Sequence, residues 1–238
     1  MKLAILTAMA AETLPILNKI GRVTSEQTIA SVKIYQIETE RHTVFLATCG
    51  VGEIRAAMAV QLLVDLFRVE AVLNFGFVGA LNPNLEIGEL VLAEKVCHYQ
   101  FDTTAIDATK IGQYENKPDE FFYLNKTLLH HVQAAVKFQL KTVTVASGDK
   151  FVATAADKAF LKSTFHADIC EMELGGIAIA CERNCVPLIS VKVVSDKADE
   201  QATVSFADVV AKGLTRYEEI LPEIFAALDS LPQGSIAP

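Results

Sequence analysis

Short apolar runs alternate along the chain with segments of helical periodicity. The runs are rich in β-branched and aromatic residues and end at polar or glycine-containing turns, which is typical of buried strands. They predict strands over Lys2–Thr7, Val32–Thr39, Thr43–Thr48, Ala71–Phe75, Leu90–Val96, Thr142–Ala146 and Leu188–Val194. Apolar residues that recur every three or four positions predict helices over Ala10–Ile20, Glu53–Phe67, Lys126–Phe138, Ala155–Ser163, Leu174–Asn184 and Phe206–Leu228.

This alternation predicts an α/β fold in which helices cover both faces of a mostly parallel or mixed sheet. A chain of 238 residues is long enough to form one large domain. We expect a single domain over residues 1–230 and a frayed tail over residues 231–238.

Composition narrows the function classes. Hydrophobic residues make up 51% of the chain, yet no run approaches the roughly 18 apolar residues of a membrane span. We therefore expect no membrane association, with apolar surface buried in the core or in a subunit interface. The five cysteines are an odd number and lie mostly in apolar segments, which favours reduced thiols in a cytoplasmic protein over disulfides. Cys181 and Cys185 lack a second ligand pair, so we expect no metal site.

The charge pattern indicates a small substrate. The net charge is −8, and the 21 basic residues are scattered rather than clustered. A nucleic-acid groove needs grouped Lys and Arg to neutralise phosphates, so we expect no nucleic-acid partner.

Polar or glycine-rich segments follow several of the predicted strands: "TAMAAE", "CGVG", "NFGFVGA" and "VVSDKADE". In sheets of this class, ligands bind beyond the carboxyl ends of the strands. "CGVG" can bring backbone amides near an anion, but it lacks the third glycine of a dinucleotide fingerprint and the Lys of a P-loop. "FGFVGA" is predicted as a strand-end turn where the backbone approaches a ligand. Ser147 has no partnered His, so no nucleophile arrangement is evident.

Two isolated carboxylates are candidates for acid or base chemistry. Glu12 is the only ionisable residue between Lys2 and Lys19, although a carboxylate in a first helical turn is also favoured by the helix dipole alone. Asp196 follows an apolar strand and Ser195, where a capping role is the alternative. A carboxyl group at the ligand edge of a sheet can be desolvated, which raises its pKa and lets it act as an acid near neutrality.

A second acidic feature is "EMELGG". Glu171 and Glu173 are two positions apart, so a helix would direct them to different sides and only one would face a ligand. Met172 between them is compatible with core packing. Gly175 and Gly176 tolerate the close approach of another backbone.

Taken together, these segments resemble the nucleoside phosphorylase superfamily, and most closely its hydrolytic branch, the 5′-methylthioadenosine/S-adenosylhomocysteine nucleosidases. The resemblance is carried, in order, by "AILTAMAAE", "GVGEIRAA", "NFGFVGAL", "IGELVLA", "ASGDKFV", "EMELGGIAIAC" and "VVSDKADEQ". It implies a three-layer α/β/α fold around a mixed, partly closed sheet. It also implies cleavage of the bond between ribose and adenine in a methionine-salvage enzyme, without a metal or organic cofactor, and a homodimer whose partner covers the 5′ end of the site.

The resemblance also implies a role for individual residues. Glu12 corresponds to the carboxylate that activates water, and Asp196 to the acid that protonates the purine at N7, oriented by Ser195. Glu173 corresponds to the acceptor of the ribose hydroxyls and Met172 to the methionine that packs on the sugar. The remaining implied pocket residues are Phe151 and Val152 at the purine, and Val51, Val78 and Gly79 around the ribose and base.

Water is favoured over phosphate as the acceptor. A phosphate dianion needs Arg, Lys or many donors, whereas the first loop carries Glu12 and no basic residue. Arg55 is the only basic side chain near the Gly-x-Gly turn. "FGFVGA" departs from the T-G-S-A-G-G that is usual in the family, and "CHYQFDTTAI" from H-D-A-D-V-T-A-F. A nucleosidase for another modified purine nucleoside, a purine nucleoside phosphorylase and a non-catalytic nucleoside-binding module therefore remain as alternatives.

Overall fold

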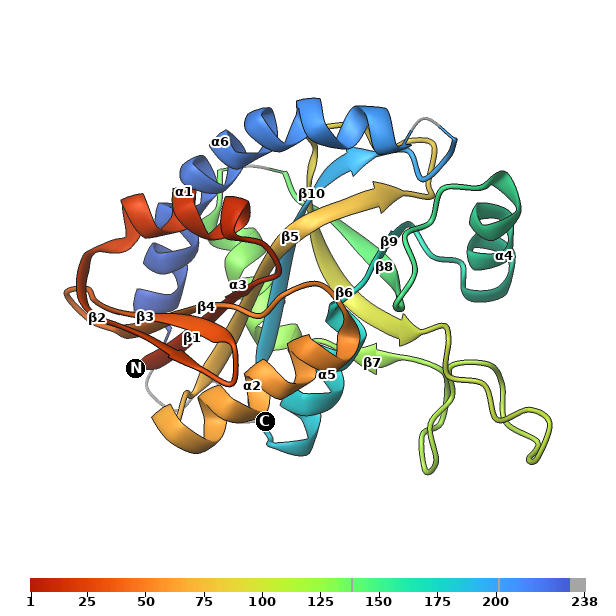
Figure 1. Cartoon of the computed structure of the whole chain (residues 1–238), viewed down its shortest axis with the longest axis horizontal. Helices are drawn as coiled ribbons and strands as arrows, with labels where there is room; N and C mark the ends of the chain where they lie inside the picture. Colours follow the sequence, from red (N-terminus) through yellow and green to blue (C-terminus); the bar gives the residue numbers. More distant parts are fainter. Residues whose placement is uncertain (138, 201, 232–238) are drawn as a thin grey trace.

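A ten-stranded mixed sheet forms the centre of the computed structural model, which describes residues 1–137, 139–200 and 202–231 (Figure 1). Its strand order is β10-β6-β8-β9-β5-β1-β4-β3-β2, and β7 pairs with β6. The strands are β1 (Lys2–Thr7), β2 (Arg22–Ile29), β3 (Val32–Glu38), β4 (Thr43–Thr48), β5 (Ala71–Ala80), β6 (Leu90–His98), β7 (Phe122–Tyr123), β8 (Lys141–Ser147), β9 (Ile169–Glu171) and β10 (Leu188–Asp196).

The sheet closes on itself at one end. β10 pairs with β6 on one side and also with β5 on the other, so that β5, β9, β8, β6 and β10 form a ring. β1, β4, β3 and β2 extend from that ring as an open sheet. The predicted mixed, partly closed sheet is confirmed.

Helices cover both faces of the sheet, as predicted. The helices are α1 (Ala10–Ile20), α2 (Glu53–Phe67), α3 (Lys126–Ala135), α4 (Ala155–Phe165), α5 (Leu174–Arg183) and α6 (Ala202–Asp229). α1, α3 and α6 lie together on one face, α2 and α5 pack against each other on the opposite face, and α4 lies at one end (Figure 1). Each face has its own apolar cluster of buried side chains, so the sheet is buried on both sides.

The two strands nearest the predicted ligand edge run further than the sequence pattern indicates. β5 continues to Ala80, so the prediction of a strand-end turn at "FGFVGA" is wrong. The reason is pairing on both sides: Phe75 to Gly79 lie in register with β10, and Gly79 and Ala80 also pair with β9. β10 likewise continues through Ser195 and Asp196 to the point where it opposes Gly79.

Three strands were not predicted, namely β2, β7 and β9. β2 is exposed along nearly its whole length, and β7 and β9 contain only two and three residues. Neither feature gives an apolar run in the sequence. α3 ends at Ala135 rather than Phe138, and α6 begins at Ala202 rather than Phe206. Position 138 and most of the predicted tail, residues 232–238, lie outside the described residues.

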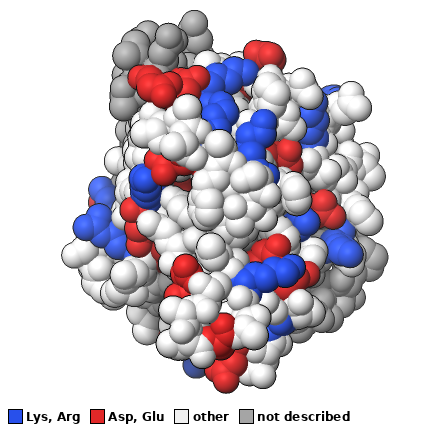
Figure 2. Space-filling model, turned by 90° about the vertical axis from the view of Figure 1, so that its right-hand side faces the viewer, with Lys and Arg blue, Asp and Glu red and all other residues white. Residues whose placement is uncertain are grey.

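Charged side chains of both signs are interspersed on the face that contains the long loop segment between β6 and β7 (Figure 2). That face has no single-sign basic stripe of the kind that binds a nucleic-acid backbone. Within the described ranges, no helix has the length and apolar character needed to cross a membrane.

Candidate active site

A cavity of about 250 Å³ lies where several strands end. Its wall comes from the segments that follow β1, β4 and β8, from the last residues of β9 and β10, and from the end of β5. Every site residue predicted from the sequence lines it: Glu12, Val51, Val78, Gly79, Phe151, Val152, Met172, Glu173, Ser195 and Asp196. Ala8, Met9, Phe77, Lys150, Cys170 and Glu171 also line it and were not predicted. The chain thus brings residues from six separate segments to one cavity.

Glu12 caps a helix and also lines the cavity. One carboxylate oxygen accepts the amides of Ala8 and Met9, each at 2.9 Å, and so caps the start of α1. The other oxygen accepts the Phe77 amide at 3.2 Å, which ties the helix to β5. Burial raises the pKa of Glu12, while these amides and the charge of Lys192 partly offset the rise. The result is a fixed, dehydrated carboxyl group at the cavity wall, suited to exchanging a proton with a bound water.

Asp196 is the last residue of β10 and is buried. Its carboxyl oxygens accept hydrogen bonds from the Ser195 hydroxyl and from the Ala198 amide, both at 2.8 Å. Burial raises the pKa of Asp196, and the two donors moderate the rise. Because the raised pKa keeps a proton on the acid at higher pH, this group is suited to donating one.

Glu171 and Glu173 do not share a helix. Glu171 ends β9, and Glu173 is the N-cap residue of α5. Both line the cavity from a tight strand-to-helix turn, and that only one of them faces the ligand stays a prediction. Glu171 also accepts the amides of Glu173 and Leu174, so it holds this turn in place. Burial and the neighbouring Glu171 raise the pKa of Glu173 to about 7.

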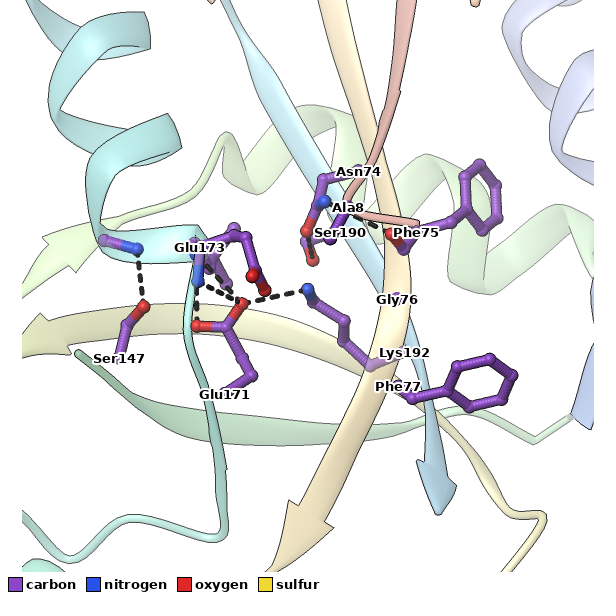
Figure 3. Close-up of polar contacts among 12 residues, drawn as sticks. Ala8, Asn74, Phe75, Gly76, Phe77, Ser147, Glu171, Glu173, Ser190 and Lys192 are labelled. Carbon is purple, nitrogen blue, oxygen red and sulfur yellow. Dashed lines mark hydrogen bonds and ion pairs between the residues drawn. The ribbon is translucent and has the colours of Figure 1, made fainter. Parts of the chain in front are cut away.

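Lys192 is the main charged residue that the sequence analysis missed. Its side chain is fully buried, and its ammonium nitrogen lies 3.1 Å from a carboxylate oxygen of Glu171, which lines the cavity (Figure 3). A Cβ atom at Gly76 would lie 3.1 Å from the ammonium nitrogen, so glycine leaves room for the lysine there. The sequence did contain the signal, since a Lys inside the apolar strand "LISVKVVSD" must be paired when buried.

The backbone amides of the Gly-x-Gly turn donate hydrogen bonds to carboxylates of the protein itself. Gly50 and Gly52 have φ of 85° and 112°, a region that favours glycine. The Gly52 amide donates to Glu173 at 3.0 Å, and the Glu53 amide donates to Asp149 at 2.8 Å. These donors are therefore already engaged, and Arg55 is exposed and does not line the cavity.

The remaining wall is largely apolar. Phe77 and Val78 are contributed by β5, and Phe151 and Val152 by the loop after β8. Such surfaces suit the flat face of a base, and the carboxyl groups are suited to hydrogen bonding with the polar edge of a base and with a sugar. In the part of the chain that is described, no group of three His, Cys, Asp or Glu could hold a metal ion.

Known proteins match this chain along nearly its whole length. Residues 2–226 match the family model of the phosphorylase superfamily. The 5′-methylthioadenosine/S-adenosylhomocysteine nucleosidase of Buchnera aphidicola is 35% identical over 94% of this chain and 98% of its own. The aminodeoxyfutalosine nucleosidase of Campylobacter jejuni is 33% identical over 88% of this chain and 92% of its own.

A solved structure extends the likeness to three dimensions. The 5′-methylthioadenosine/S-adenosylhomocysteine nucleosidase of S. pneumoniae, bound to a transition-state inhibitor, superposes with a TM-score of 0.89 at 28% identity. The match covers 96% of this chain and 100% of that structure. The chain therefore belongs to the phosphorylase superfamily, among its nucleosidases, and is an N-glycosyl hydrolase.

Proposed function

We propose that the chain hydrolyses the N-glycosidic bond of 5′-methylthioadenosine, S-adenosylhomocysteine or both. The products are adenine and the thioribose. The observation that carries this proposal is the placement of two separately buried carboxyl groups, Glu12 and Asp196, in the wall of one nucleoside-sized cavity. Hydrolysis of a glycosidic bond needs such a pair in opposite protonation states.

In the proposed reaction Asp196 donates its proton to purine N7. The bond between the base nitrogen and C1′ breaks, and its electron pair stays on the departing adenine. A ribosyl cation remains, and Glu12 takes a proton from the water whose oxygen forms the new bond to C1′. Glu173 accepts the ribose hydroxyls and so orients the sugar, while Met172 packs on it.

The anionic surroundings support water as the acceptor. Lys192 is paired with Glu171, and Lys150 at the rim is paired with Asp157 at 2.8 Å. A phosphate dianion would face Glu12, Glu171 and Glu173 in the same cavity. Repulsion from these carboxylates disfavours the phosphorylase alternative.

A substrate panel tests the choice of nucleoside. We expect adenine release from 5′-methylthioadenosine and S-adenosylhomocysteine, measured by chromatography, with adenosine a poorer substrate because it lacks the 5′ thioether. Aminodeoxyfutalosine is the second candidate, supported by the Campylobacter relative. A kcat/KM highest for aminodeoxyfutalosine would assign the chain to that substrate. Binding without release of any base would instead indicate a non-catalytic module.

We further propose that the chain is a homodimer. Val51, Ile54 and Met58 are 43%, 71% and 55% exposed, and their spacing puts them on one side of the start of α2. Since Val51 also lines the cavity, a partner packed on this apolar surface would cover the open side of the site.

Four of the five free cysteines are buried, which supports a reducing, cytoplasmic setting.

A further inference from the structure

Glu53 is a buried carboxyl group that the proposed reaction does not use. It is the first residue of α2 and is only 5% exposed. Among the described residues, neither of its carboxyl oxygens makes a hydrogen bond of standard geometry. An unpaired carboxylate is costly to bury, whereas a neutral carboxylic acid is much less so.

The carboxyl group sits in a notch formed by two glycines of α5. A Cβ atom at Gly175 would lie 2.7 Å from both carboxyl oxygens of Glu53. A Cβ atom at Gly176 would lie 2.3 Å from the backbone carbonyl oxygen of Glu53. The starts of α2 and α5 therefore meet at Glu53 at a distance that only glycine permits.

The same contact borders the ribose side of the cavity. The preceding residue, Gly52, donates its amide to Glu173, and the Glu53 amide donates to Asp149. The position of the α2 start thus determines whether Glu173 keeps its amide partner. A displacement of Glu53 would loosen the proposed ribose anchor.

The ionisable groups that face Glu53 are acidic or neutral. Glu171, at the turn before α5, and Asp149, in the loop after β8, raise its pKa. Cys97 of β6, with Tyr99 and Tyr114 in the segment that follows, also lies within its electrostatic reach. Burial is the largest cause and brings the pKa of Glu53 to about 8. The Ser147 hydroxyl and the Gly176 amide lie near enough to offset part of the rise, although neither makes a hydrogen bond of standard geometry with the carboxyl group.

We propose that Glu53 is a positioning residue, whose neutral carboxyl group seats in the Gly175–Gly176 notch and holds the Gly52 amide on Glu173. Its ionisation at alkaline pH places a further negative charge beside Glu171 and Asp149, separates the starts of α2 and α5, and weakens nucleoside binding. This inference rests on the proposed function, because it assigns Glu173 to the ribose.

The binding test uses the Glu53→Gln substitution, which keeps the shape of the neutral acid. Dissociation constants for 5′-methylthioadenosine are measured by calorimetry from pH 6.5 to 9.5, on D196N and D196N/E53Q proteins so that turnover does not interfere. We expect the dissociation constant of D196N to rise at least about threefold between pH 8 and pH 9.5, above the pKa of Glu173, and that of D196N/E53Q to show no such rise. D196N/E40Q, changed at an exposed glutamate far from the cavity, should follow D196N. Parallel profiles for all three proteins would overturn the inference.

A stability test needs no ligand and so separates this inference from the proposed function. Between its ordinary value of 4.5 and about 8, Glu53 is ionised in the unfolded chain but protonated in the folded one. Folding stability therefore falls with rising pH across that window and levels off above it. The Tm difference between E53Q and the wild type should therefore shift in favour of E53Q by about 3 °C or more when the pH is raised from 5 to 8. An equal pH dependence of the two Tm values would contradict a neutral Glu53.

Variants that enlarge the glycines and shorten Glu53 test the contact between them. G175A should lower the Tm and weaken nucleoside binding, because the new methyl group meets the Glu53 side chain. Adding E53A should restore the Tm, since it removes the side chain that the methyl group meets, but it should not restore nucleoside binding, which needs the seated carboxyl group. G176A is the matched control: its conflict is with the Glu53 backbone, so E53A should not rescue it. Failure of E53A to rescue G175A would overturn the inference, and a chain that binds no nucleoside but shows this rescue would contradict only the proposed function.

Discussion

Asp196→Asn is expected to lower kcat for 5′-methylthioadenosine by about 10²–10⁴-fold, the usual contribution of a general acid. The Asn side chain still accepts from the Ser195 hydroxyl or the Ala198 amide, so the β10 end should keep its shape. It has no proton of suitable acidity for purine N7, and the departing adenine would leave as an anion. Steady-state adenine release measures the effect, and KM should change little.

A substrate with a better leaving group sharpens this prediction. A p-nitrophenyl 5-methylthioriboside releases a phenolate that needs no protonation, so D196N should lose little activity toward it. Asp65→Asn, an exposed aspartate on α2, is the matched control and should behave like the wild type. Equal losses on both substrates would show that Asp196 does not act as the acid.

Glu12→Gln is expected to lower kcat by a similar factor of about 10²–10⁴, but on both substrates, because either leaving group still requires an activated water. The pH profile should support the same assignment. A base works when deprotonated, so wild-type activity should fall as the pH drops through the raised pKa of Glu12. It should also fall as the pH rises through the raised pKa of Asp196, which must stay protonated.

Glu12→Gln has a structural consequence that must be separated from the chemical one. The amide side chain cannot accept at both of its ends, so amides among those of Ala8, Met9 and Phe77 lose an acceptor. Leaving a buried donor unpaired costs about 1–3 kcal/mol of folding stability. Urea unfolding and nucleoside binding by the variant check that it remains folded, with E40Q as the control. Activity within a few-fold of the wild type would remove Glu12 from the mechanism.

Most of the helices and central strands could be predicted from the sequence because their apolar residues recur with a clear period. α1 and α2 begin and end at the predicted residues, as do β1 and β4. The closure of the sheet could not be derived in that way. It depends on β9, a three-residue strand, and on a second pairing of β10 with β5, and neither leaves a local pattern.

The site residues were predicted by resemblance rather than by periodicity, and the cavity brings all of them together. What the resemblance left out were groups specific to the interior of this chain. Lys192 lies in a predicted strand and Glu53 in a predicted helix. In such elements a single charged residue is usually predicted to be exposed to solvent. The structure shows that both are buried next to the cavity wall, Lys192 against Glu171 and Glu53 against Gly175.

Hydrolysis in water enriched in ¹⁸O tests the central claim most directly. A single turnover of 5′-methylthioadenosine in phosphate-free buffer should release adenine and place one ¹⁸O atom at C1 of the methylthioribose, as read by mass spectrometry. The yield should be the same when phosphate is added. Adenine release only in the presence of phosphate, with a sugar 1-phosphate as the product, would contradict the account.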